Sequence, residues 1–206
     1  APRVIHAVSH AGLMALFGDG RITDERLVNA TIVVVDESKV WTPDAIPYQT
    51  QIPSAHHGIA IPVDDDHVLY SLPVPERLAG NAGRQYALPG TFQVTDYTGR
   101  VLHSLTDTTK TDTSCSGFHG EYAVDHTLIL ACDDDHGGVV VVDYDPVSET
   151  YSSRALLYPT NYDDHRTGSF AYHSAAPRGV GILAAADAYY LVSFTPQDQQ
   201  MQSSYV

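Results

Sequence analysis

A short phrase, histidine followed by glycine, occurs twice in this chain and heads two similar stretches. It stands at His57-Gly58 and again at His119-Gly120. Each copy leads into an apolar run, then an acidic turn, then a second apolar run that is rich in valine in the later copy. A unit repeated at intervals of tens of residues is typical of small sheets stacked in series. It also means that histidines at equivalent positions can converge, and convergent imidazoles commonly hold a transition metal.

The rest of the sequence predicts an all-β chain. No helical periodicity extends beyond about two turns, and the short apolar runs are bounded by glycine, proline and acidic turns. Valine, threonine and tyrosine, which favour strands, are plentiful between these turns. The run at residues 30–35 and the runs at 127–131 and 139–142 are examples.

The strands fall into units of four, which is the pattern of a β-propeller built from four-stranded antiparallel blades. The sequence predicts about four blades in a single domain, at residues 1–52, 53–112, 113–160 and 161–206. Four blades alone would crowd their inner strands at the axis. We therefore expect this chain to supply part of a larger ring, completed by a second chain or a missing segment.

The charge of the chain excludes two classes of partner. The net charge is -14 and the pI is about 4.9, whereas nucleic acids and anionic membranes attract clusters of Lys and Arg. No apolar stretch of ~20 residues predicts a membrane span. No signal peptide is recognisable either, and Ala1–Ile5 already has strand character, so a mature or trimmed product is expected.

Two cysteines, Cys115 and Cys132, are separated by 16 residues that read as two strands joined by a turn. A disulfide across neighbouring strands fits this spacing and implies an oxidising compartment. Two reduced, buried thiols are the alternative. The spacing is not that of a CxxC metal or redox pair.

The candidate metal ligands are histidines at the start of blades. In a propeller the first strand of each blade lines the central channel, so residues opening that strand ring one rim. His57 and His119 hold the same place in two blades. His10, just before a turn in the first blade, is a candidate third member, and His56 is a neighbour that could turn toward the same site. Imidazole suits Zn²⁺ and Cu²⁺.

Further ligands are less clearly indicated. A tetrahedral zinc site needs four ligands, and Glu121 would face the same side as His119 by strand alternation. His165 and His173 are auxiliary candidates in the last blade. Thr167 stands where that blade would carry the equivalent histidine, and it is a poor ligand.

From about residue 53 onward, the chain resembles the periplasmic zinc metallochaperones of the AztD type. The resemblance is carried by the segments 56–62, 115–121, 131–133, 166–168 and 173–177. It implies a β-propeller that holds Zn(II) and passes it to the substrate-binding protein of a zinc ABC transporter. It also implies a periplasmic location, His57 and His119 as channel histidines, and a bridge between Cys115 and Cys132.

Three functions are therefore weighed. The first is a zinc carrier that is not an enzyme and releases its ion to a partner by ligand exchange. The second is a metal-dependent propeller hydrolase or lyase with Glu121 as general base. The third is a protein-interaction propeller without metal. The sequence contains neither a G-x-S-x-G elbow nor an HExxH helix, two common signatures of hydrolases.

Overall fold

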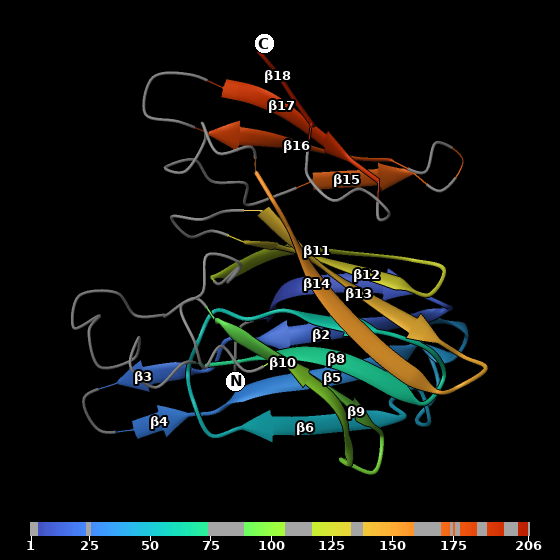
Figure 1. Cartoon of the computed structure of the whole chain (residues 1–206). Helices are drawn as coiled ribbons and strands as arrows, with labels where there is room; N and C mark the ends of the chain where they lie inside the picture. The colour runs from blue at the N-terminus through green and yellow to red at the C-terminus, as the bar shows by residue number, and fades with distance from the viewer. Residues whose placement is uncertain are drawn as a thin grey trace. The chain divides into compact units, whose positions relative to one another are not determined.

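The computed structural model of the chain describes residues 4–23, 26–73, 89–105, 117–132, 138–158, 170–173, 175, 178–184, 189–195 and 202–205. Most of these residues form β-strands (Figure 1). The chain divides into two compact units, Ala1–Thr106 and Asp107–Val206. Within the described ranges, no helix has the length and apolar character needed to cross a membrane.

The first sheet of unit 1 is an antiparallel blade in the order β1-β2-β5-β6. Strands β1 and β2 are joined by a two-residue turn in which Ala11 and Gly12 both have positive φ, the backbone that a tight hairpin requires. After β5 the chain makes one 3₁₀ turn, and Asp36 caps it by accepting a hydrogen bond from Ser38 N at 3.0 Å. The strands are β1 (Val4–His10), β2 (Leu13–Gly18), β5 (Ala30–Asp36) and β6 (Tyr48–Ile52), with the hairpin β3 (Arg21–Thr23) and β4 (Arg26–Val28) and the 3₁₀ turn η1 (Glu37–Lys39) outside the sheet.

The second sheet of unit 1 is antiparallel and contains four sequential strands. They are β7 (Ala60–Pro62), β8 (His67–Leu72), β9 (Thr91–Asp96) and β10 (Val101–Leu105). The sequence predicted that His57-Gly58 opens a strand, but β7 begins only at Ala60. His57 and Gly58 instead lie in the segment that connects the two sheets.

The two sheets of unit 1 share one core. Strand alternation places Ala15, Phe17 and Ile32 on the same buried face of the first sheet, where they contact Val68 and Tyr70 of the second. Each fully buried large apolar side chain contributes about 1.5–3 kcal/mol. This core fixes the connection between β6 and β7, which crosses from one sheet to the other.

Unit 2 repeats the arrangement with two further antiparallel sheets. Ile129 and Val141 of the first contact Leu183, Val192 and Phe194 of the second in one core. The strands are β11 (Phe118–Val124), β12 (Thr127–Cys132), β13 (Gly138–Asp145) and β14 (Thr150–Leu157) in one sheet, and β15 (Phe170–His173), β16 (Arg178–Ala184), β17 (Tyr189–Phe194) and β18 (Gln202–Tyr205) in the other.

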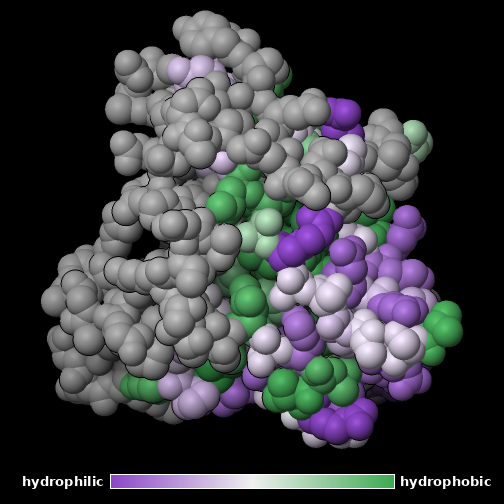
Figure 2. All heavy atoms as spheres, in the orientation of Figure 1, coloured by the Kyte–Doolittle hydropathy of each residue, from purple (hydrophilic) through white to green (hydrophobic). Residues whose placement is uncertain are grey.

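The all-β prediction and the four-stranded antiparallel sheets are confirmed. The valine-rich runs do form the predicted strands, because side chains on both faces of β12 and β13 are buried and such strands are apolar throughout. On the visible surface, hydrophobic and hydrophilic residues are interspersed (Figure 2). Trp41 is the most exposed large apolar side chain of the described residues.

The predicted disulfide falls partly outside the described residues. Cys132 ends β12 and is fully buried, whereas Cys115 lies outside the described ranges. The bridge between them therefore stays a prediction.

Gly58 is a position where the packing leaves no room for a side chain. A Cβ there would overlap the ring of Phe17 and lie 2.7 Å from Ser71 Oγ. We expect Gly58→Ala to lower the free energy of unfolding by about 1–3 kcal/mol, measured by urea denaturation.

The Phe17→Leu variant supplies the matching test. If the clash with the Phe17 ring is the cause, the double variant is less destabilised than the sum of the single variants, by about 0.5–3 kcal/mol. Simple additivity of the two single effects contradicts this explanation.

Candidate metal centre

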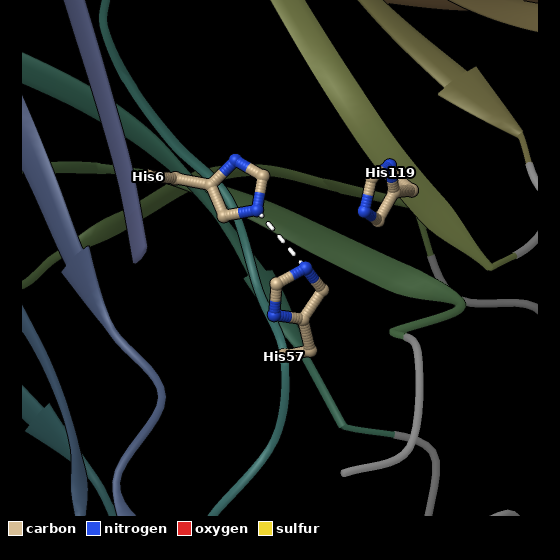
Figure 3. A group of neighbouring side chains, drawn as sticks. All are labelled: His6, His57 and His119. Carbon is tan, nitrogen blue, oxygen red and sulfur yellow. Dashed lines mark hydrogen bonds between the residues drawn. The ribbon is translucent and has the colours of Figure 1, made fainter. Parts of the chain in front are cut away.

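Two histidine side chains of unit 1 meet edge to face. His6 is carried by β1, and His57 lies in the connection between β6 and β7. Their Nε2 atoms are 3.1 Å apart, and their ring centroids are 4.8 Å apart with an interplanar angle of 63° (Figure 3). Both side chains are half-buried. The pair therefore brings two ring nitrogens from distant parts of the sequence to within hydrogen-bond distance.

The second nitrogen of His57 contacts a buried carboxylate. His57 Nδ1 lies 2.9 Å from Oδ2 of Asp19, and Asp19 is only 2% exposed. The other carboxylate oxygen, Oδ1, is buried and has no hydrogen-bond partner among the described residues. Burying a carboxylate oxygen without a hydrogen-bond partner is unfavourable in free energy. A positive charge near His57 would therefore stabilise Asp19.

The chemistry of Asp19, His57 and His6 decides which ring nitrogens carry a hydrogen. A carboxylate only accepts hydrogen bonds, so His57 Nδ1 carries a hydrogen and donates it to Asp19. A neutral His57 then has its lone pair on Nε2, and it accepts from His6 Nε2. The lone pair of His57 thus faces a second imidazole, which is the arrangement that a metal ion can take over.

The backbone around the pair holds these groups in place. Asp19 O accepts a hydrogen bond from His56 N at 3.0 Å, and Ser54 O accepts one from Ala30 N at 2.6 Å. Gly20, next to Asp19, has a φ of +74°, and a Cβ there would overlap the backbone of Val28. Asp19 is therefore fixed to the same connecting segment by both its backbone and its side chain.

His56 and His10 make other contacts. The ring of His56 is fully buried, with Nδ1 3.3 Å from Ser54 Oγ and Nε2 3.4 Å from Ser71 O. His10 Nδ1 lies 3.0 Å from Pro62 O. Of the four histidines that the sequence singles out as ligands, the structure thus brings His57 to His6. Both ring nitrogens of His56 and Nδ1 of His10 instead lie against oxygen atoms of the protein.

His119 belongs to unit 2, where β11 carries it between Phe118 and Gly120; Figure 3 also labels this residue. The register of β11 against β12 shifts between Phe118 and Glu121, and Gly120 has a φ of +99°. This bulge interrupts the strand alternation on which the prediction for Glu121 rested. His119 and Glu121 are both half-buried.

The remaining predicted positions are in the last blade. His173 ends β15 with an exposed side chain, and its Nδ1 accepts a hydrogen bond from Ala175 N at 3.2 Å. His165 and Thr167 lie outside the described residues.

Sequence analysis missed His6, because no glycine follows it. The distance to the next hairpin turn does not mark it either. His6 precedes the last paired residue of its strand, His10, by four positions, whereas His119 precedes its counterpart, Val124, by five. Counting back five residues from His10 gives Ile5, so neither spacing selects His6.

The geometry of the pair fits zinc. Two nitrogen ligands at about 2.0–2.1 Å from a tetrahedral ion lie about 3.3 Å apart, close to the observed 3.1 Å. A metal-bound histidine usually donates its other N–H to a carboxylate, as His57 does to Asp19. Oδ1 of Asp19, which is buried without a hydrogen-bond partner among the described residues, would be stabilised by a positive charge nearby.

Solved structures similar to this chain are β-propellers. The Dos1 propeller matches with a TM-score of 0.59 at 12% identity, covering 98% of this chain and 50% of that one. The propeller domain of the Trilobed protease from Pyrococcus furiosus matches at 0.53 and 10%, covering 99% and 57%. The propeller domain of Cps50 (Swd1) from Myceliophteria thermophila matches at 0.52 and 11%, covering 100% and 58%.

These similarities establish the fold class, a β-propeller architecture, and the chain spans half to three-fifths of the length of these propellers. No protein-family model matches the chain, and no curated protein matches it either. The resemblance to AztD-type zinc metallochaperones accordingly stays a prediction.

The buried His56 predicts how stability depends on pH. Burial lowers the pKa of this imidazole to about 4 from its usual value near 6.5. Between these values the unfolded chain binds a proton that the folded chain does not, so stability falls as the pH falls. We expect His56 to lower the unfolding free energy by about 1.4 kcal/mol per pH unit between pH 6.5 and 4.

The measurement is urea unfolding of metal-free protein across this pH range. The control is His56→Gln, which keeps a polar side chain but does not titrate. Its unfolding free energy should fall less steeply than that of the wild type. Equal slopes for the two proteins rule out His56 as the source of the pH dependence.

Proposed function

We propose that this chain is a zinc carrier whose ion is held by His6 and His57. The hydrogen bond from His57 to Asp19 supports His57 as a ligand. The observation that supports this most directly is the pair of Nε2 atoms at 3.1 Å, one of them backed by a buried carboxylate. Bound Zn(II) is cargo in this proposal, and the chain is not an enzyme. The ion replaces the hydrogen shared by the two nitrogens.

His119 is proposed as the third ligand on the strength of the sequence repeat. It corresponds to His57 in the sequence repeat, since each is followed by a glycine, and it is half-buried near the start of β11. His56 is not carried forward as a ligand, since both of its ring nitrogens already contact protein oxygens. His10 is not carried forward because it lies four residues along β1 from His6, about 13 Å at the usual strand rise. Imidazole ligands suit zinc.

The receiving partner in this proposal is the substrate-binding protein of a zinc ABC transporter, and the location is periplasmic. Both follow from the resemblance to the AztD-type metallochaperones. Two features of the chain favour a carrier over a structural zinc site. The two histidines are half-buried, so an incoming ligand can reach the ion, and the strongly acidic chain attracts cations.

The binding step is tested by zinc competition with a chromophoric chelator. We expect a single tightly bound ion per chain. His6→Ala, His57→Ala and His119→Ala should each weaken the affinity by more than the roughly 10–100-fold loss typical of a residue that only supports a ligand, because each removes a metal–nitrogen bond.

The matched control is His10→Ala, since His10 is a half-buried histidine on the same strand as His6. This variant should bind zinc like the wild type. Equal losses in His6→Ala and His10→Ala contradict the assignment of His6. Normal binding by His119→Ala removes that residue from the ligand set and leaves the pair in unit 1.

The delivery step is tested with the zinc-loaded chain and the metal-free substrate-binding protein of a zinc ABC transporter. Direct ligand exchange predicts that zinc reaches this acceptor faster than it dissociates into excess chelator. Metal-free carbonic anhydrase, a tight zinc binder with an unrelated surface, serves as the control acceptor and should load no faster than dissociation allows. Equal rates for both acceptors argue against a carrier that docks on its partner.

A further inference from the structure

We propose that Asp19 is the positioning residue of the metal centre: it fixes the tautomer of His57 and supplies the buried negative charge that sets the affinity for a cation. This inference rests on the proposed function for its metal readout. Its first half, the tautomer of His57, concerns the metal-free protein and can be tested independently.

The position of Asp19 is determined before any metal arrives. Asp19 follows the end of β2 and lies between two glycines, Gly18 and Gly20. Its backbone oxygen accepts from His56 N, and its side chain accepts from His57 Nδ1. Two neighbouring residues of the connecting segment are thus hydrogen-bonded to the residue that follows β2.

The carboxylate of Asp19 is almost fully buried, and only one of its two oxygens has a hydrogen-bond partner among the described residues. Asp19 is 2% exposed, and the oxygen without such a partner is Oδ1. Burying a charged oxygen without a partner is unfavourable unless a compensating charge lies nearby. A divalent cation on Nε2 of His57 polarises the Nδ1–H bond and provides that compensation.

The contact also decides which lone pair is offered to a metal. A free neutral imidazole exchanges between two tautomers, and only the Nδ1–H form leaves Nε2 able to coordinate. The 2.9 Å contact with Asp19 selects this form. Because Nε2 of His57 faces Nε2 of His6 at 3.1 Å, the selected lone pair points to the second proposed ligand.

Two substitutions separate orientation from charge. Asp19→Asn keeps an oxygen that can accept from His57 Nδ1 but removes the negative charge. Asp19→Ala removes both. The matched control is Asp64→Asn, because Asp64 accepts from His67 Nδ1 over the same 2.9 Å distance in the same unit, and neither residue is a proposed ligand.

The first measurement is the tautomer of His57 in zinc-free protein, read from long-range ¹H–¹⁵N correlation spectra. The wild type and Asp19→Asn should show a single Nδ1–H form, and Asp19→Ala should show a mixture. Asp64→Asn should leave the His57 signals unchanged. A pure Nδ1–H form in Asp19→Ala overturns the proposal, whatever the zinc measurements give.

The second measurement is the zinc affinity of the same proteins. Loss of an outer partner typically weakens metal binding about 10–100-fold, so Asp19→Ala should fall in this range, with Asp19→Asn between it and the wild type. Wild-type affinity in Asp19→Ala overturns the role of the buried charge. If the wild type itself binds no zinc, the proposed function fails, while the tautomer experiment still decides the role of Asp19.

Thermal unfolding followed by circular dichroism shows whether each variant keeps the fold. Asp19→Ala leaves the backbone hydrogen bond to His56 N in place, so its strands should be retained. If it does not fold, Asp19→Asn carries the test: wild-type zinc affinity in this variant contradicts a role for the charge, and a several-fold loss with an unchanged His57 tautomer supports it.

Discussion

The connection between β6 and β7 is the part of unit 1 on which the candidate metal centre depends. It leaves the first sheet, passes the end of β2 and enters the second sheet. Gly58 lets it lie directly on the ring of Phe17, and His56 N bonds to Asp19 O. The site is therefore built where two blades are joined by close packing and backbone hydrogen bonds.

The sequence predicted the strands far better than the site. The run Val139–Val142 is short and entirely β-branched, which favours a strand over a helix, and a strand buried on both faces needs apolar residues throughout. The metal ligands depend instead on contacts between distant segments. His6 and His57 are 51 residues apart, and no local pattern marks His6, because the glycine that follows His57 serves to pack against Phe17.

Two further differences between sequence and structure have local causes. His56 and His57 are adjacent, yet one ring is fully buried between Ser54 and Ser71 while the other faces His6. Extended backbone sends neighbouring side chains to opposite sides, so one residue of such a pair serves the core. In β11, the bulge around Gly120 disrupts the alternation used to place Glu121. Bulges are set by tertiary packing, which sequence periodicity does not reveal.

A carrier must release its zinc ion, whereas a structural zinc site must retain it. The arrangement around His57, in which the charged group and the proposed ligands are different residues, suits a carrier. A structural site gains stability from enclosing its ion, with four protein ligands. In the proposed centre, the charge that would attract the ion lies on Asp19, which is buried and in contact with His57. The nitrogens that would touch the ion belong to half-buried side chains. Asp19 can then raise the affinity for the ion without coordinating it, and the coordinating histidines can still exchange the ion with ligands of a partner.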